Sequence, residues 1–483
     1  MSESIKLLQP QAVWEYFYAI TQIPRPSKKE EKIIAYLLEF GKKYKLETQK
    51  DETGNVLIRK NASKGFEDFP TVVLQSHMDM VCEKNNDVDH DFEKDPIRTY
   101  IEEGWVKAMG TTLGADDGIG VATQLAILAA DDIEHGPLEC LFTMDEESGL
   151  SGAFGLKPDL LKGKILLNLD SEDEGELFIG CAGGRDTNVS FDLSWEAVPK
   201  DYIGYKIDIN GLQGGHSGDD IHKGFGNANK ILNRIVYLGA EKYGLRISLL
   251  DGGNLRNAIA REAFAEVVIP KDSEADFKAM FDQMATDIKL ELHKTEPNLN
   301  FDLNEIEPSS KVWSLELQNR VLNALYACPH GVIAWSQDIP NFVETSTNLA
   351  AVKTLKDRIE ITTSQRSSSE SEMEDVVAMV ASAFKLAGAQ IEHSVGYPGW
   401  KPNPNSKIME ITSLTYEKLF DKKPKVLAVH AGLECGLIGK TYPKMDMISY
   451  GPTIKGAHSP DERIEIKTVQ MFWDLTLDIL KSV

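Results

Sequence analysis

Hydrophobic residues are arranged differently in different parts of the chain. Up to about residue 185, short and mostly apolar runs alternate with stretches in which apolar residues recur at helical spacing. The runs are Asn55–Arg59, Val72–Leu74, Leu138–Thr143 and Lys164–Leu169. Strands that are buried on both faces have this composition, and intervening helices are typical of parallel sheets. The pattern therefore predicts an α/β layer around a mostly parallel sheet.

Helices are expected between these strands. Residues 10–45 form two amphipathic segments separated by Pro24-Arg25-Pro26, and Ser27 and Glu30 have the spacing of a capping box before the second segment. The stretch 113–120 is rich in glycine and opens a third helix. Glycines let the backbone approach a ligand closely at such a helix start.

Strands after residue 186 alternate polar and apolar residues more regularly. This alternation is typical of a sheet with one covered face, often antiparallel. A proline-rich segment at 398–404 ends the region, and the earlier pattern then returns. We therefore predict one α/β domain from residues 1–185 and 398–483, interrupted by an inserted α+β lid domain at 186–397. The insert is expected to contain strands at 205–210, 263–269 and 358–362 and helices at 227–238, 273–293 and 372–386.

Composition and charge exclude several classes of protein. The 483 residues suit two or three domains. The formal net charge of -23 argues against nucleic acid or an anionic membrane as a partner, because both require a basic surface. The first residues lack a secretory hydrophobic region, and the apolar runs are shorter than the about 18 residues that span a bilayer. Five scattered cysteines without a CxxC pair favour a reducing compartment, so we expect a cytoplasmic protein.

Candidate metal ligands recur at the ends of the predicted strands. His77 and Asp79 follow the apolar run Val72–Leu74, and residues two apart in an extended chain point to the same side. The carboxyl ends of parallel strands lie along one edge of a sheet, so further residues can meet there. Imidazoles with several carboxylates suit zinc, manganese or cobalt better than calcium or magnesium. The other candidates are Glu146, Glu147 and Asp170 after strands, Asp116 at a loop–helix junction and His458 near a later strand.

Each of these motifs also has an ordinary structural interpretation when it is taken alone. A histidine after a strand is more often a satisfied polar residue than a ligand. Asp145-Glu146-Glu147 suits a solvated acidic turn, and residues 170–176 suit an exposed loop or a weak calcium site. The glycine-rich stretch at 114–118 suits a turn with a helix cap. The equivalent placement of all the motifs in one sheet is what favours a metal site.

Several segments together resemble a known family. The chain is similar, over essentially its whole length, to the co-catalytic zinc peptidase family that includes carnosinase, aminoacylase and bacterial dipeptidases. Any one of the segments is moderately specific, and together they are highly specific. They are Ser76–Asn85, Leu113–Gly120, Asp145–Gly149, Leu169–Glu172, Gly214–Gly218 and Ala457–Pro460.

The resemblance implies a site for two divalent metal ions, with zinc favoured over manganese or cobalt. Asp116 would bridge the ions, Glu146 would be the general base, and Asp79 would orient His77. A cis peptide bond is expected after Asp116, and relatives often carry Asn where this chain has Asp117. The ligand sets would be His77, Asp116 and Asp170 for one ion and Asp116, Glu147 and His458 for the other.

This resemblance implies a dipeptidase in which the 1–185 and 398–483 segments form the catalytic domain. Two metals about 3.5–4 Å apart can share a hydroxide and polarise a scissile carbonyl, and Glu146 can pass a proton to the leaving amine. The expected substrates are unblocked dipeptides, including aminoacyl-histidine types. The alternatives are an N-acyl amino-acid deacylase or a carboxypeptidase of the same family, and a non-catalytic metal-binding or peptide-binding homologue. The resemblance also leaves a homodimer open.

Further candidates for substrate binding lie outside the metal motifs. His216, in a glycine-flanked turn, is similar to a family histidine that stabilises the oxyanion, although a surface histidine explains the residues nearly as well. Asn257 and Arg366 are expected to bind the carboxylate of the substrate, since Arg pairs with carboxylates in bidentate fashion. A surface ion pair is the alternative for Arg366. Gly432 and Glu434 are expected to line the pocket, with Glu434 reading a substrate amine.

Overall fold

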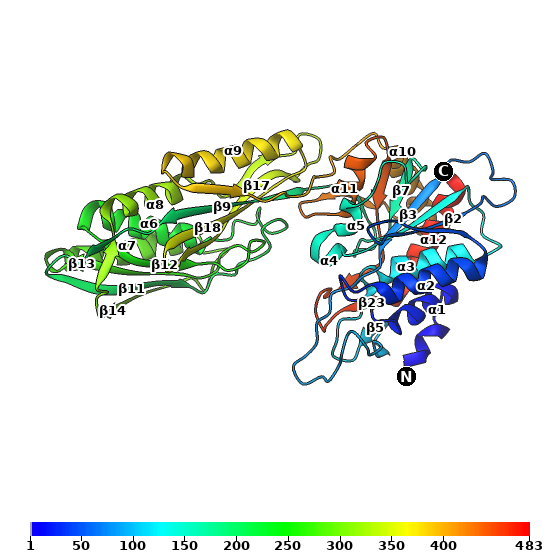
Figure 1. The fold of residues 1–483 in the computed structure, drawn as a ribbon, viewed down its shortest axis with the longest axis horizontal. Helices are drawn as coiled ribbons and strands as arrows, with labels where there is room; N and C mark the ends of the chain where they lie inside the picture. Colours follow the sequence, from blue (N-terminus) through cyan, green and yellow to red (C-terminus); the bar gives the residue numbers. More distant parts are fainter. Residues whose placement is uncertain (1) are drawn as a thin grey trace. The chain divides into compact units, whose positions relative to one another are not determined.

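The computed structural model describes residues 2–483, and its contacts divide the chain into two compact units (Figure 1). The first unit comprises the residues up to Gly180 together with Trp400–Ala428 and Leu433–Val483, and the second comprises Cys181–Gly399 and Val429–Gly432. The boundaries thus lie at 180/181 and 399/400 instead of the predicted 185/186 and 397/398. The first difference arises because strand β9 of the second unit already begins at Gly183. No local pattern signals that Val429–Gly432 belongs to the second unit.

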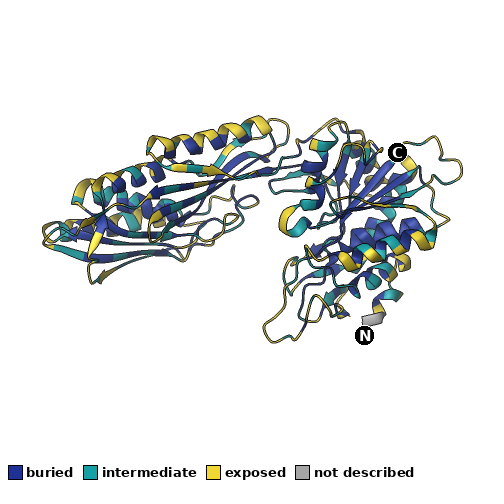
Figure 2. Cartoon of the chain, viewed as in Figure 1, coloured by how far each residue is buried: buried dark blue, intermediate teal, exposed yellow. Residues whose placement is uncertain are grey.

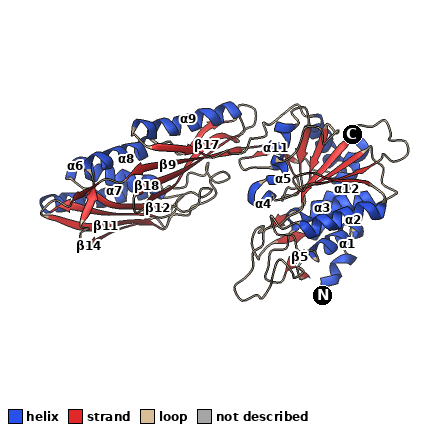
Figure 3. Ribbon diagram, in the orientation of Figure 1, coloured by secondary structure: helices blue, strands red, loops and turns tan. Residues whose placement is uncertain are grey.

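The first unit is built on a mixed eight-stranded sheet whose centre is parallel (Figure 3). The central strand β3 pairs in parallel with β6 on one side and with β7 on the other, and β7 pairs in parallel with β21. The edge pair β1–β2 is antiparallel. The predicted α/β class is confirmed. In sheet order the strands are β1 (Glu47–Lys50), β2 (Val56–Lys60), β6 (Leu138–Thr143), β3 (Val72–His77), β7 (Ile165–Asn168), β21 (Asp446–Ser449), β8 (Glu176–Cys181) and β20 (Lys425–Val429).

Helices of the first unit bury apolar faces in one core with this sheet (Figure 2). In α1 the buried residues Val13, Trp14, Phe17 and Ile20 recur at helical spacing, so the helix is amphipathic as the sequence predicts. Helix α3 is buried on almost every side, so its sequence is apolar all round. The longer helices are α1 (Gln11–Thr21), α2 (Glu31–Tyr44), α3 (Ala115–Ala129), α10 (Lys407–Phe420) and α12 (Ile466–Ser482).

Shorter elements complete the first unit. A 3-10 helix spans Ser2–Leu7. The helices α4 (Glu146–Gly149), α5 (Ser151–Phe154) and α11 (Glu434–Thr441) are each under three turns long. A small four-stranded sheet contains β22 (Ile454–Lys455), β23 (Arg463–Glu465), β5 (Trp105–Ala108) and β4 (Thr99–Glu102), in that order.

The second unit is a nine-stranded sheet packed against helices (Figure 3). Every strand pair recorded in it is antiparallel, in agreement with the alternating sequence pattern. Helix α8 (Leu315–Ala327) was not among the predicted helices, whereas α6 (Ala228–Tyr243), α7 (Glu274–Glu291) and α9 (Glu370–Leu386) were. The strands are β14 (Asn300–Ile306), β11 (Tyr202–Asn210), β13 (Ala263–Pro270), β12 (Arg246–Gly252), β17 (Val343–Thr354), β18 (Arg358–Ser367), β9 (Gly183–Asp192) and β19 (Gln390–His393), with β16 (Gly331–Trp335) beside β17; β10 (Trp195–Ala197) pairs with β15 (Lys311–Trp313).

Among residues 2–483, none of the helices combines the length and the apolar character that crossing a bilayer requires.

The centre of β3 lies in the core of the first unit, so shortening a side chain there should lower the stability of this unit. Leu74 is fully buried between β6 and β7, so Leu74→Ala should lower the free energy of unfolding of this unit by about 3 kcal/mol. Leu414 in α10 is 61% exposed, and Leu414→Ala should cost less than about 0.5 kcal/mol. Urea-dependent hydrogen exchange in peptides from β3 and β6 measures both values. Equal midpoints for the two variants would contradict the assignment of β3 to the core.

Candidate metal centre

Three overlapping groups of side chains in the first unit could each hold a metal ion. In every group the candidate ligand atoms lie within 4.8 Å of one another. All six predicted ligand and base residues take part, so the structure brings together positions that are far apart in the sequence. The groups are His77–Asp116–Asp170, Asp116–Glu147–His458 and His77–Glu146–Glu147.

Asp116 is common to two of these groups because each of its oxygens faces a different imidazole. Its Oδ1 lies 2.9 Å from Nε2 of His77, and its Oδ2 lies 3.1 Å from Nε2 of His458. His77 Nε2 is also 3.4 Å from Asp170 Oδ1, and His458 Nε2 is 3.0 Å from Glu147 Oε2. A carboxylate with one oxygen in each group has the arrangement that a bridging ligand needs.

Strand ends bring most of these side chains to one edge of the sheet. His77 is the last residue of β3, and Asp170 follows the end of β7 by two positions. Glu146 and Glu147 begin α4, just after β6. Because β6, β3 and β7 are parallel neighbours, their carboxyl ends lie together, as the sequence analysis expects.

The turn that carries the two glutamates is held by its own side chains. Asp145, in the left-handed region at φ 50°, accepts hydrogen bonds from the hydroxyls of Ser148 and Ser151. Glu30 accepts the backbone N–H of Asp145 at 3.0 Å and that of Lys28 at 2.8 Å. The predicted capping box at Ser27 and Glu30 is therefore wrong: Glu30 is itself the N-cap residue of α2, and its side chain supports this turn instead.

Asp79 links the first imidazole to the same turn. It is fully buried, and its Oδ1 lies 3.4 Å from Nδ1 of His77. It also accepts the backbone N–H groups of Glu146 at 3.1 Å and Glu147 at 3.3 Å, and the hydroxyl of Ser27 at 2.8 Å. Burial opposes ionisation of Asp79, but the contact with His77, together with the hydrogen bonds from Ser27 and Glu146, outweighs it and lowers the pKa of Asp79. A carboxylate behind the histidine can thus fix the ring and the turn together.

Asp116 lies in the first turn of α3, where its backbone is not helical, and two buried charged residues hold this segment in place. Glu462 accepts the backbone N–H groups of Leu113 at 2.7 Å, Gly114 at 3.0 Å and Ala115 at 2.7 Å. Arg25 donates to the carbonyls of Asp79 and Gly114, both at 2.5 Å. The following peptide bond, Asp116–Asp117, is cis, as the resemblance implies. Sequence reasoning missed both supports, because Arg25 marked only a helix break and Glu462 belonged to no motif.

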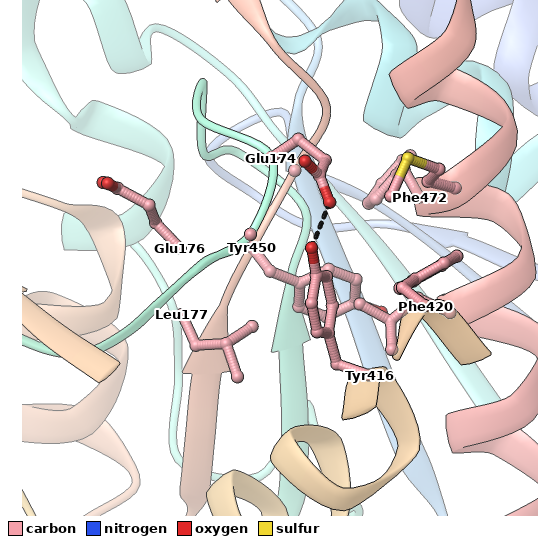
Figure 4. A pocket seen from close by; sticks show the side chains of 11 residues that line it. Glu174, Glu176, Leu177, Tyr416, Phe420, Tyr450 and Phe472 are labelled. Atoms are coloured by element: carbon pink, nitrogen blue, oxygen red, sulfur yellow. Dashed lines mark hydrogen bonds between the residues drawn. The ribbon is translucent and has the colours of Figure 1, made fainter. Parts of the chain in front are cut away.

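The segment after Asp170 is attached to the segment that leads to His458. The carbonyl of Glu172 accepts the N–H of Ile454 at 3.0 Å. Figure 4 shows the hydrogen bond from the Tyr416 hydroxyl to Glu174, beside the ring of Tyr450. The bond between Glu172 and Ile454 joins the chain near Asp170 to the chain near His458, and the bond from Tyr416 ties the same segment to α10.

The residues present suit divalent cations. Burial raises the pKa of Asp170 to about 7, with the carboxylates of Asp116 and Glu147 adding to the shift. Burial also raises the pKa of Glu146 well above its ordinary value. Glu147 Oε1 is buried and has no hydrogen-bond partner among residues 2–483. Buried carboxylates that crowd against one another need a compensating cation, and two imidazoles with carboxylates are ligands typical of zinc.

Most of the predicted substrate residues lie in the second unit and adjoin one another. Arg366, which is 6% exposed, has Nη2 at 3.4 Å from His216 Nε2 and donates to the Tyr397 hydroxyl at 3.2 Å. The carbonyl of Asn257 accepts the N–H of the residue after His216 at 2.8 Å. A Cβ at Gly432 would meet the Tyr397 ring at 2.7 Å. Sequence reasoning missed Tyr397, which contacts two of the predicted positions.

The position of Glu434 differs from the predicted one, which was in the lining of a substrate pocket. Its side chain has no exposed surface and accepts hydrogen bonds from Gln75 and Thr143 inside the first unit. It is the first residue of α11 and belongs to the buried part of that helix.

A sheet parallel at its centre, with a cluster of two imidazoles and several carboxylates at its strand ends, is an arrangement that suits a metal-dependent hydrolase. The chain belongs to peptidase family M20/M25/M40, whose defining pattern matches residues 73–481. This membership confirms the predicted family resemblance and the prediction of a peptide-bond hydrolase.

Individual relatives match over the full length. The chain is 46% identical over 483 residues to the cytosol non-specific dipeptidase of Escherichia coli, covering 100% of this chain and 99% of that protein. The crystal structure of aminoacylhistidine dipeptidase from Vibrio alginolyticus is similar with a TM-score of 0.94 and 46% identity, covering 100% of this chain and 99% of that one. An aminopeptidase from Bacillus cereus shares the fold at a TM-score of 0.63 and 19% identity, over 98% of this chain and 99% of that one.

Proposed function

We propose that this protein is a metal-dependent dipeptidase that hydrolyses unblocked dipeptides, including aminoacyl-histidine types. The observation that carries the proposal is the placement of Asp116 between His77 and His458, with one carboxylate oxygen toward each ring. The names of the Escherichia coli and Vibrio alginolyticus relatives support the substrate class. A cytoplasmic location and a homodimer belong to the same proposal, and the word cytosol in the name of the first relative supports the location.

The proposed cofactor is a pair of divalent ions, zinc before manganese or cobalt. When bound, such a pair lowers the pKa of a water molecule and polarises the scissile carbonyl. Asp116 would be the shared ligand. The remaining ligands would be His77 and Asp170 for one ion and Glu147 and His458 for the other.

Glu146 is the proposed general base. It lies in a group with His77 and Glu147, so its carboxylate is next to the proposed metal ligands. Glu147 instead directs Oε2 toward His458 at 3.0 Å, which separates the roles of the two adjacent glutamates. Glu146 would take a proton from the attacking water and deliver it to the leaving amine. Asp79 would hold His77 and the turn that carries Glu146 and Glu147 in fixed positions relative to each other, through its contacts with both.

Residues of the second unit would contact the C-terminal carboxylate of the substrate and the oxyanion formed in the reaction. Arg366 would pair with the C-terminal carboxylate, because its guanidinium already lies in a polar cluster with His216 and Tyr397. His216 would stabilise the oxyanion, as the family resemblance implies, from a ring whose Nδ1 is 3.2 Å from the backbone N of Asp219. Asn257 and Gly432 would complete this contact surface.

A substrate panel tests the proposal. We expect glycyl-histidine and β-alanyl-histidine to be hydrolysed with kcat/KM at least about 100-fold above that of their N-acetylated forms, because a site built for a charged amine rejects a blocked one. Tripeptides and N-acetyl amino acids are the controls. Preferred hydrolysis of N-acetyl amino acids would indicate a deacylase, preferred release of a C-terminal residue from longer peptides a carboxypeptidase, and no turnover by the metal-loaded protein a non-catalytic homologue.

A further inference from the structure

Four buried polar side chains link three neighbouring strands beneath the candidate metal centre. Gln75 lies in β3, Thr143 ends β6, Asn168 ends β7, and Glu434 begins α11. All four side chains have 0% exposure. None of them belongs to the proposed ligand sets or to the proposed base.

These side chains form one continuous hydrogen-bond network. Oε2 of Glu434 accepts from Gln75 Nε2 at 2.6 Å and from the Thr143 hydroxyl at 2.7 Å. Asn168 Nδ2 donates to Gln75 Oε1 at 2.6 Å, and Gln75 Nε2 also lies 3.1 Å from Thr143 Oγ1. One carboxylate oxygen from late in the chain therefore holds two strands directly and the third through Gln75.

Three of the network residues precede candidate site residues by two or three positions in the sequence. Gln75 precedes His77 by two residues, Asn168 precedes Asp170 by two, and Thr143 precedes Glu146 by three. Residues two apart in an extended strand point to the same side, so Gln75 shares a sheet face with His77. Gln75 and Asn168 are also direct cross-strand partners in the parallel register. Any slip between these strands would change the spacing of His77 and Asp170.

A carboxylate is an unfavourable choice for this position unless it has a role. Ionised groups are rarely fully buried without a charge partner, and Oε1 of Glu434 has no hydrogen-bond partner among residues 2–483. An apolar side chain would fill the same space but would remove the one oxygen that accepts from both Gln75 and Thr143. Glu434 supplies a single acceptor oxygen for donors on two strands, Gln75 in β3 and Thr143 in β6.

We propose that Glu434 is a positioning residue whose buried carboxylate fixes the ends of β3, β6 and β7, and thereby the spacing of His77, Glu146 and Asp170. The inference rests on the metal site of the proposed function. It assigns Glu434 no contact with the substrate.

The test is the visible absorption of the cobalt-substituted protein in matched variants. Glu434→Leu should weaken cobalt binding about 10-fold to 100-fold and alter the d–d bands, because groups behind metal ligands contribute by this amount. Glu434→Gln keeps an acceptor oxygen and should recover most of the affinity and the wild-type bands. Thr476→Val removes a buried hydroxyl that donates to Phe472 in α12, so it should lower stability and leave the cobalt spectrum unchanged.

A second pair of variants covers the outcome in which Glu434→Leu does not fold. Thr143→Val removes one donor at constant shape and should shift the cobalt bands, whereas Thr143→Ser should restore them. Wild-type affinity and bands in Glu434→Leu, or in a folded Thr143→Val, would overturn the inference. A wild-type chain that binds cobalt but hydrolyses no dipeptide would sink the proposed activity alone, and one that binds no cobalt would sink the metal site and this inference with it.

Discussion

Glu146→Gln is expected to lower kcat for dipeptide hydrolysis by about a thousandfold while both metal ions stay bound. The amide has the size of the carboxylate but cannot accept a proton from water at neutral pH. Glu146 is not needed by either ligand set that shares Asp116, so the ions should keep their ligands. Steady-state kinetics on a dipeptide, with metal content measured on the same sample, gives both values.

Glu147→Gln is the matched comparison for this variant. The same chemical change one residue along should remove an ion, because Glu147 Oε2 faces His458 in the second ligand set. The two neighbouring substitutions would then differ in metal content and agree in lost activity. Loss of metal with partial activity in Glu146→Gln would show that the roles are assigned wrongly.

Asp116→Ala should remove both ions and all measurable activity. Its two oxygens lie at 2.9 Å and 3.1 Å from the two imidazoles, so each ligand set loses a member and the crowded carboxylates lose their counter-charge. His458→Ala should remove one ion only, because His458 belongs to one set. Metal analysis after dialysis against metal-free buffer measures the stoichiometry.

Asp117→Asn is the control for the Asp116 variant. Asp117 is adjacent in the chain and buried, but its Oδ1 accepts the N–H of Gly120 at 3.1 Å instead of facing an imidazole. The variant should therefore keep both ions. Two bound ions in Asp116→Ala, or none in Asp117→Asn, would contradict the proposed sharing of Asp116.

Much of the fold could be predicted from local patterns, because the spacing of apolar residues indicates which faces of a helix or strand are buried. Strands such as β3 and β6 are buried along their length and were predicted from apolar runs alone. The alternating strands of the second unit pair antiparallel, as alternation indicates. The capping box at Ser27 and Glu30 failed because a tertiary contact, the Asp145 turn, competes for the Glu30 side chain.

The candidate site residues that lie at strand ends could be predicted from the sequence. The residues that support the site through hydrogen bonds to distant parts of the chain could not. His77, Glu146 and Asp170 follow strands, and sheet topology brings such ends together. Arg25 and Glu462 support the Asp116 segment from opposite ends of the sequence, and nothing local marks a buried arginine or glutamate. These residues act through burial and long-range hydrogen bonds, which only the three-dimensional structure contains.

The central claim is that Asp116 joins two metal ions, and anomalous diffraction from crystals grown with zinc tests it most directly. The account predicts two peaks at the zinc edge, one among His77, Asp116 and Asp170 and the other among Asp116, Glu147 and His458. A single peak that does not touch Asp116, or peaks only at other residues, would contradict it.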